Sequence, residues 1–123
     1  GSMETGRQAA AEAMAKDLGC IMLLKGCGTV ITDGSTIYIN PTGNPSMARG
    51  GSGDVLTGIL LSLMAQGYPQ EDACRLGVYV HGLAGDIAAE EKTEIGMTAS
   101  DIIDALPLAW KKIRPTAKDI KKE

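Results

Sequence analysis

The chain has 123 residues, of which 44% are hydrophobic and 22% charged, and this suits one globular domain with a modest core. The net charge of −3, the 3% of aromatic residues and the lack of a basic stretch before residues 118–122 argue against nucleic acid as a partner. The three cysteines form no CxxC pair, there is no secretory signal, and no apolar run approaches the ~18 residues of a membrane span. We therefore expect a reduced, cytoplasmic protein with no membrane partner.

The first third of the chain predicts a helix, a strand and a hairpin. The segment from about Glu4 to Leu18 is rich in Ala, Met, Glu and Lys, which favour helix. Residues 21–24 form a short apolar run near glycines, which indicates a strand buried on both faces. Residues 29–32 and 36–40 are rich in β-formers and are separated by an Asp-Gly pair, so they predict a hairpin.

The rest of the chain predicts a loop followed by three helices. Residues 40–45 contain two prolines, a glycine and two asparagines, which are typical of a loop. Apolar residues at helical spacing predict helices over about 53–66, 71–91 and 100–113. Residues 98–101 resemble a capping box for the last helix, and Pro107 is expected to kink or interrupt it.

One strand and one hairpin make a small sheet for these helices, so several apolar helix faces would lack a partner. We infer that residues 4–123 form part of a larger α/β domain, or that the chain pairs with another chain to complete its sheet. Residues 1–3 resemble the remnant of an expression tag and are left out of this reasoning.

The stretch Gly50–Asp54, which has three glycines, stands at the start of a predicted helix. Clustered glycines let backbone N–H groups turn toward one point, and the helix N-terminus adds partial positive charge, which suits a phosphate or another oxyanion. At the rim of such a site, the carboxylate of Asp54 is suited to handle a proton or to orient a metal or hydroxyl. The alternative is a glycine-rich turn in which Asp54 only favours the helix dipole. The stretch is neither a Walker A loop nor a GxGxxG motif.

Residues 25–29, with the sequence Lys-Gly-Cys-Gly-Thr, connect the predicted strand to the hairpin. Loops at the carboxyl ends of strands are where α/β proteins bind ligands, and Lys25 or Thr29 could reach a ribose or a phosphate. A flexible connection with a solvated lysine is equally consistent with the spacing. Cys27 has no histidine near it in sequence, so we do not expect a nucleophile there.

Asn44 and His81 each have a functional and a structural interpretation. Asn44 could bind a ligand or a metal-bound water, although an asparagine in such a loop more often closes an Asx-turn. His81 is the only histidine and lies in a predicted apolar helix. Its default role is a packed, hydrogen-bonded one, and the alternative is a polar edge of a nucleotide pocket. One histidine offers too few ligands for a resident metal site.

These motifs together resemble a known family. In chain order they are Leu24-Lys25-Gly26, Thr29-Val30-Ile31, Asp33-Gly34, Thr42-Gly43-Asn44, Met47-Ala48, Gly50-Gly51-Ser52-Gly53-Asp54-Val55-Leu56, His81-Gly82, Ala84-Gly85-Asp86 and Ala88-Ala89. At this spacing the chain after residue 3 resembles the ADP/ATP-dependent NAD(P)H-hydrate dehydratases. The resemblance implies a ribokinase-like three-layer α/β/α fold, to which this chain would contribute a short sheet with a hairpin and about four helices.

The resemblance also implies a reaction and roles for residues. That family repairs nicotinamide cofactors whose ring has been hydrated: the nucleotide phosphorylates the hydroxyl, and phosphate then leaves as the double bond reforms. Asp54 would be the general base at the substrate hydroxyl, and the amides of Gly51, Ser52 and Gly53 would form the anion hole. The implied nucleotide-binding residues are Lys25, Gly26, Cys27, Gly28, Thr29, Asn44 and Gly53. ADP or ATP, Mg²⁺ and hydrated NADH or NADPH would be the ligands.

One departure from the family is large, because its domain is about twice as long as this chain. We expect the chain to be the carboxy-terminal half of such a domain, able to bind nucleotide but dependent on the other half or on a homo-oligomer for turnover. Two alternatives stay open. One is a ribokinase-like kinase for a vitamin-precursor alcohol, and the other is a non-catalytic module that assembles through its free sheet edge.

Overall fold

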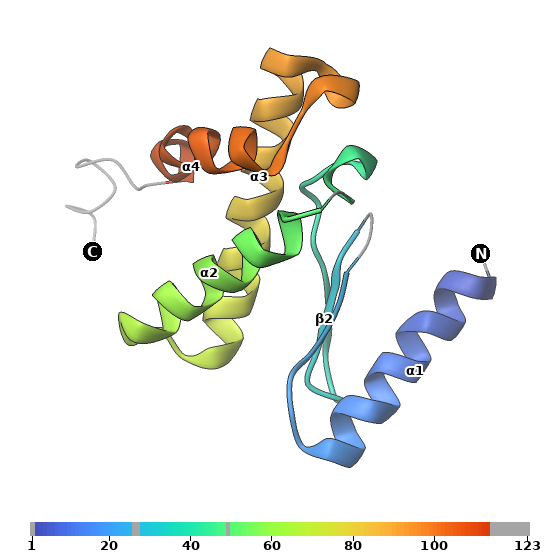
Figure 1. Ribbon diagram of the computed structural model, residues 1–123. Helices are drawn as coiled ribbons and strands as arrows, with labels where there is room; N and C mark the ends of the chain where they lie inside the picture. Colours follow the sequence, from blue (N-terminus) through green and yellow to red (C-terminus); the bar gives the residue numbers. More distant parts are fainter. Residues whose placement is uncertain (1, 26–27, 49, 114–123) are drawn as a thin grey trace.

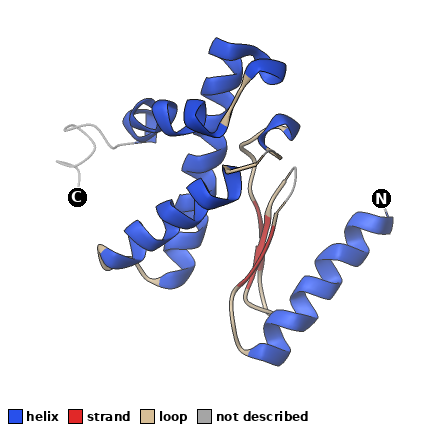
Figure 2. Ribbon diagram, viewed as in Figure 1, coloured by secondary structure: helices blue, strands red, loops and turns tan. Residues whose placement is uncertain are grey.

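The computed structural model describes residues 2–25, 28–48 and 50–113. The elements are α1 (Ser2–Leu18), β1 (Met22–Leu24), β2 (Val30–Thr32), β3 (Ile37–Ile39), the short 3₁₀ helix η1 (Pro45–Met47), α2 (Ser52–Ala65), α3 (Gln70–Gly96) and α4 (Ala99–Ile113). Helices α2, α3 and α4 lie on one side of the small sheet and α1 lies on the other (Figures 1 and 2). The expected α/β fold with a layered arrangement is therefore confirmed.

The three strands form an antiparallel sheet in the order β1-β2-β3. The predicted hairpin is confirmed as β2 and β3, which pair through Ile31 and Tyr38. Asp33 shapes the turn, because its Oδ1 accepts the backbone N–H groups of Ser35 and Thr36, both at 2.8 Å. These hydrogen bonds favour the carboxylate and hold the pKa of Asp33 below its ordinary value.

The prediction that residues 21–24 are buried on both faces was wrong. The residues of β1 are half-buried, whereas those of β2 are buried throughout. The reason is position: within the described residues β1 pairs with β2 alone, whereas β2 lies between β1 and β3. Continuous apolar runs indicate a central strand, but they do not identify the strand's neighbours.

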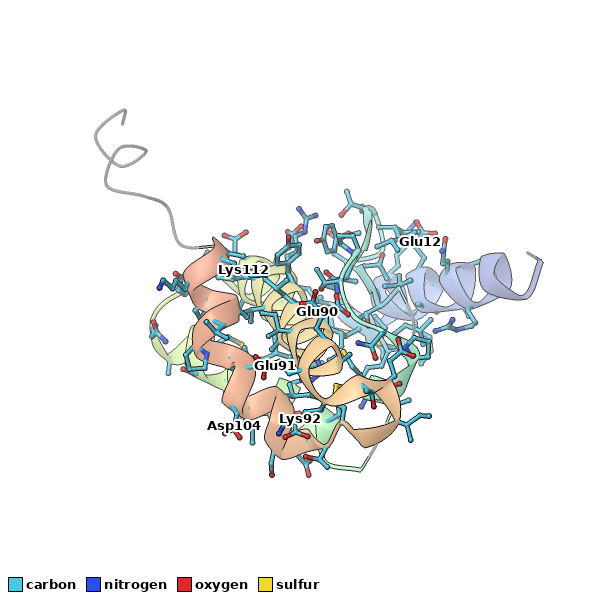
Figure 3. The ribbon with its side chains drawn as sticks, turned by 90° about the horizontal axis from the view of Figure 1, so that it is seen from above. Glu12, Glu90, Glu91, Lys92, Asp104 and Lys112 are labelled. Atoms are coloured by element: carbon cyan, nitrogen blue, oxygen red, sulfur yellow. The ribbon has the colours of Figure 1, made fainter. Side chains whose placement is uncertain are left out.

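The main core lies where α2, α3 and α4 meet. Its fully buried members include Val80 and Ala84 of α3 and Ile102 of α4, together with Met97 from the connection between these helices. A second cluster joins Ile31 of β2 to α2 and α3 and ties the sheet to the helices. Charged side chains such as those of Asp104 and Lys112 on α4 lie on the outside of the fold (Figure 3).

Helix α3 extends further than predicted, to Gly96 rather than Glu91. The extension includes a break at Thr93, whose φ of 63° and ψ of 158° are not helical. The capping box at residues 98–101 is confirmed: the Asp101 carboxylate accepts the Thr98 N–H at 2.9 Å, and Thr98 Oγ1 accepts the Asp101 N–H at 3.3 Å. The hydrogen bonds that the N–H and the hydroxyl of Thr98 donate to this carboxylate lower the pKa of Asp101.

Pro107 does not interrupt α4, which continues from Ala99 to Ile113. A proline removes one backbone donor, here the partner expected for the carbonyl of Ile103. Both Pro107 and Ile103 lie on the exposed side of the helix, where water can reach that carbonyl. Among the described helices, none is long and apolar enough to cross a membrane.

Candidate functional site

A cavity of about 390 Å³ opens where the sheet, the loop over residues 40–48, the start of α2 and the middle of α3 meet. Its walls are contributed by Lys25, Thr29, Asn40, Thr42, Gly43, Asn44, Pro45, Met47, Ala48, Ser52, Gly53, Leu56, Val78, His81 and Gly82. Four of the residues predicted for nucleotide binding, Lys25, Thr29, Asn44 and Gly53, are therefore brought together at one cavity. We refer to it as the α3-side cavity.

The N-terminus of α2 presents unpaired backbone donors to this cavity. Gly51 is the N-cap residue, and its φ of 91° is in the left-handed region that favours glycine. Among the described residues no side-chain hydrogen bond caps this end, and the first helical bond is donated by the Val55 N–H to the Gly51 carbonyl. The N–H groups of Ser52 and Gly53 thus precede the helical ladder and add to the partial positive charge of the helix end.

The ammonium group of Lys25 lies directly over this helix end. A Cβ atom placed on Gly53 would stand only 2.8 Å from Lys25 Nζ. The absence of a side chain at Gly53 is what lets a full positive charge approach the backbone donors of the helix. A cation and oriented amides at one point form an arrangement suited to a phosphate group.

His81 of α3 lines the same cavity next to the first residue of α2, and it is 9% exposed. Its Nε2 lies 3.1 Å from the carbonyl oxygen of Ser52 and 3.3 Å from the Ser52 hydroxyl. Burial, opposed by the Ser52 carbonyl and reinforced by the charge of Lys25, lowers the pKa of His81, so the ring is neutral at pH 7. Two alternative roles for His81 followed from the sequence, a packed and hydrogen-bonded side chain or a polar edge of a pocket. In the structure His81 is buried and hydrogen-bonded, and it also lines the cavity.

The loop after β3 is tied to α3 by polar side chains. Asn40 donates from Nδ2 to the Thr42 carbonyl at 3.1 Å and to the Val78 carbonyl at 3.4 Å, and Thr42 Oγ1 donates to the Tyr79 carbonyl at 2.9 Å. Asn40 is 3% exposed, and its Oδ1 has no hydrogen-bond partner among the described residues. The wall of the cavity therefore includes a buried acceptor.

Asn44 forms an Asx-turn, which is one of the two roles predicted for it from the sequence. Its Oδ1 accepts the Ser46 N–H at 3.1 Å, and its Nδ2 donates to Asp86 Oδ1 at 3.0 Å. The other oxygen of Asp86 accepts the Gly43 N–H at 3.0 Å. The amide of Asn44 is thus occupied within the chain, although the residue lines the cavity.

Local sequence reasoning gave no role in the site to Gly82, Gly85 and Asp86 of α3, which entered only as part of the family resemblance. Besides His81 and Asp86, the helix uses two glycines as contact points for the loop. A Cβ on Gly82 would lie 2.2 Å from Thr42 Oγ1, and one on Gly85 would lie 2.2 Å from Met47 Sδ. The pattern His-Gly-x-x-Gly-Asp, whose residues share one helix face, is the signal from which this could have been found.

Asp54 does not line the α3-side cavity. It is exposed and lines a second cavity of about 670 Å³ between α2 and α4, whose walls are mostly apolar and include Ile59, Leu106 and Trp110. Gly53 and Asp54 are neighbours in the first turn of α2, where successive residues point about 100° apart around the axis. The helix end therefore stands between the two cavities. We refer to the second as the α4-side cavity.

Three other predicted site residues are placed as follows. Gly28 is half-buried next to Ile39 but is not part of the wall of the α3-side cavity. Gly26 and Cys27 lie outside the described residues. In the part of the chain that the structure describes, no group of three or more His, Cys, Asp or Glu side chains is placed to hold a metal ion.

Comparison with known families decides the relationship. The model of the NAD(P)H-hydrate dehydratase family matches residues 1–108. The chain belongs to the NAD(P)H-hydrate dehydratase family. Relatives in this family include the bifunctional NAD(P)H-hydrate repair enzyme Nnr of Moorella thermoacetica, 46% identical over 86% of this chain and 20% of that enzyme. The ADP-dependent (S)-NAD(P)H-hydrate dehydratase of Cenarchaeum symbiosum is 38% identical over 86% of this chain and 37% of that enzyme.

Solved structures of NAD(P)H-hydrate dehydratases are similar to the chain in fold. The ADP/ATP-dependent enzyme from Bacillus subtilis, co-crystallised with ATP and Mg²⁺, has a TM-score of 0.84 and 32% identity over 91% of this chain and 41% of that one. A ribokinase-like superfamily protein from Enterococcus faecalis has a TM-score of 0.72 and 36% identity over 82% of this chain and 35% of that one. The chain thus spans between a fifth and about two fifths of the length of these proteins.

Proposed function

We propose that the protein carrying this chain uses ADP or ATP to dehydrate hydrated NADH or NADPH, and that this chain supplies the nucleotide site and the catalytic base. The observation that carries the proposal is the meeting of Lys25 Nζ with the uncapped N-terminus of α2 at Gly53. This arrangement suits the phosphates of a nucleotide, and it occurs in a chain of the NAD(P)H-hydrate dehydratase family.

The chemistry explains why a nucleotide is consumed. Hydroxide is a poor leaving group, whereas phosphate is a good one. In the first step the substrate hydroxyl oxygen attacks the terminal phosphoryl group, a new P–O bond forms, and the shortened nucleotide leaves as the bridging P–O bond breaks. In the second step the C–O bond breaks, inorganic phosphate leaves, and the neighbouring carbon loses a proton as the double bond reforms.

The positions of the residues match this division of labour. Lys25 and the N–H groups of Gly51, Ser52 and Gly53 would hold the phosphates and stabilise the charge of the transferring group. Asp54 would accept the proton of the substrate hydroxyl from the other side of the helix end. A nucleotide in the α3-side cavity and a substrate in the α4-side cavity would then meet across the first turn of α2.

Further predicted residues, of which Thr29 and Asn44 line the α3-side cavity, have supporting roles in this proposal. Thr29, Gly28 and the neighbouring Gly26 and Cys27 would contact the nucleoside part. Asn44 would shape the wall, because its side-chain amide is occupied by Ser46 and Asp86. The magnesium ion would arrive with the nucleotide phosphates, since the described residues present no acidic cluster of their own.

The remaining parts of the proposal concern setting and partners. We propose a cytoplasmic protein that acts on a small molecule. Either other parts of the enzyme or a second copy of the chain would complete the substrate side near Asp54. The exposed apolar residues Leu61, Met64 and Ile103 on α2 and α4 support this, because such side chains favour a covered position.

A repair assay tests the proposed function directly. The full protein carrying this sequence is mixed with hydrated NADPH, Mg²⁺ and either ADP or ATP, and the return of the reduced-nicotinamide absorbance is followed together with released phosphate. We expect recovery that depends on the nucleotide, with one phosphate released per cofactor restored. Formation of a stable phosphoester without recovery would instead indicate a ribokinase-like small-molecule kinase.

A further inference from the structure

His81 is a buried titratable group that the proposed reaction does not use. It lies on α3, far in sequence from the glycine-rich loop, yet its ring contacts the first residue of α2. Both partners are largely shielded from solvent, with Ser52 5% and His81 9% exposed, and both line the α3-side cavity. This polar contact joins a side chain of α3 to the N-terminal end of α2, where we propose that phosphate binds.

The contact determines which ring nitrogen carries the proton. A carbonyl oxygen only accepts hydrogen bonds, so the 3.1 Å approach of Nε2 to the Ser52 carbonyl requires a proton on Nε2. The opposite tautomer would bring two acceptors together at this distance. The neutral ring with Nε2–H is therefore the form that fits, and the charge of Lys25 close by also disfavours the doubly protonated ring.

The same proton decides what the Ser52 hydroxyl can do. Its oxygen lies 3.3 Å from Nε2, which already carries a hydrogen, so the hydroxyl cannot donate to that nitrogen. Among the described residues, no other acceptor for the hydroxyl proton is found. The Ser52 hydroxyl accepts a weak hydrogen bond from His81 and faces the α3-side cavity. Its own proton is therefore available to a ligand in that cavity.

We propose that His81 is a positioning residue that fixes the Ser52 hydroxyl as a hydrogen-bond donor to a phosphate oxygen of the bound nucleotide. The inference rests on the proposed function, because it assumes a nucleotide phosphate in the α3-side cavity. It goes beyond that function by giving Ser52 a side-chain role in addition to its backbone amide, and by making that role depend on a helix 29 residues further along the chain. The Lys25 ammonium, the α2 amides and this hydroxyl then form one set of donors.

A double-mutant cycle on nucleotide binding tests this dependence. The dissociation constant for MgADP is measured by calorimetry for the wild type, Ser52→Ala, His81→Leu and the double variant. Loss of a hydrogen bond to a charged group weakens binding by about ten-fold or more, so Ser52→Ala is expected to do so in the wild type. In the His81→Leu background the same change should have little effect.

A conservative variant separates positioning from packing. The side-chain amide of His81→Gln can still donate to the Ser52 carbonyl, so this variant should restore most of the ten-fold effect of Ser52→Ala. An equal effect of Ser52→Ala in all three backgrounds would overturn the proposal while leaving nucleotide binding intact. Failure of the wild type to bind MgADP would count against the proposed function itself, so the two failures are distinguishable.

The tautomer is measured on the unaltered protein, which removes any dependence on how the variants fold. Nitrogen-15 NMR of the His81 ring distinguishes a protonated Nε2 from a protonated Nδ1. We expect the proton on Nε2 at pH 7.5, both before and after addition of MgADP. A proton on Nδ1 would make Nε2 the acceptor of the Ser52 hydroxyl and would overturn the proposal.

Discussion

The two cavities at the start of α2 differ in how many polar and charged groups this chain supplies to their walls. The α3-side cavity has a cation, unpaired amides, a buried histidine and a loop tied to α3 through Asn40 and Asp86. The α4-side cavity has Asp54 at one end and mostly apolar walls. The difference teaches that this chain already carries groups suited to hold a phosphate, whereas the proposed selection of the group that receives the phosphate would need further groups.

The largest effect is expected when the carboxylate of Asp54 is replaced, and this change tests the difference between the two cavities. Asp54→Asn should lower turnover by about 10²- to 10⁴-fold, because the proton acceptor is lost. Affinity for MgADP should stay nearly constant, because the amides and Lys25 on the other side of the helix end are unchanged. Steady-state kinetics and calorimetry measure the two effects. Asp104→Asn, an exposed acid on α4, is the matched control, and a loss of nucleotide affinity with retained turnover would contradict the assignment.

A side chain at Gly53 should damage the α3-side cavity instead. The first added carbon of Gly53→Val would lie 2.8 Å from Lys25 Nζ and would push the ammonium away from the helix end. We expect MgADP affinity to fall by roughly ten-fold, the size of a lost charge-assisted hydrogen bond. Gly58→Val is a suitable control, because it lies on the same helix and nothing stands within 4 Å of its added carbon. Equal affinities for the two variants would refute the phosphate position.

The packing of the loop on α3 is tested by stability. Gly82→Ala would place a carbon 2.7 Å from the Thr42 backbone carbon, so backbone must move, and overpacking of this kind costs about 1–3 kcal/mol of unfolding free energy. Gly58→Ala, on an exposed helix position, should instead raise stability by up to ~1 kcal/mol through helix propensity. Urea unfolding measures both. A Gly82→Ala protein as stable as the wild type would show that the loop is held less closely.

The smallest expected effect is a pH dependence from His81. The folded state lowers its pKa, so the unfolded chain binds the proton more readily once the pH falls below the ordinary value of 6.5. The stabilising contribution is complete above that value and is lost as the pH falls through the folded pKa, with a slope of at most ~1.4 kcal/mol per pH unit for one proton.

Unfolding free energies at pH 7.5 and 5.5, for the wild type and His81→Gln, measure this slope. The wild type should lose more stability than the variant between these pH values. Asp33 and Asp101 also have lowered pKa values, but as acids they act below their ordinary value of 3.8, outside this window. An identical slope for both proteins would show that His81 does not titrate differently on folding.

Local sequence signals predicted much of the fold and part of the site. The Asp33-Gly34 pair identified the hairpin, and the capping box at residues 98–101 identified the start of α4. The glycine-rich stretch identified an uncapped helix end. Each of these depends on residues within a few positions of one another, where spacing translates directly into hydrogen bonds.

Contacts between distant segments could not be predicted in the same way. Asp86 reaches Gly43 and Asn44, and His81 reaches Ser52, across separations of 43, 42 and 29 residues that carry no periodic signal. The separation of Asp54 from the residues proposed to bind nucleotide was predictable in principle, because successive residues in a helix point in different directions.

The glycines of α3 have a consequence for how the molecule folds. Each glycine within a helix lowers its intrinsic helicity by about 1 kcal/mol relative to alanine, and Gly77, Gly82 and Gly85 fall within three turns. The middle of α3 therefore relies on a tertiary contact for its helical state, and the loop of residues 42–47 supplies that contact. We therefore expect the loop and the middle of α3 to fold as one cooperative unit, so that this wall of the α3-side cavity becomes ordered in the same step as the backbone that supports it.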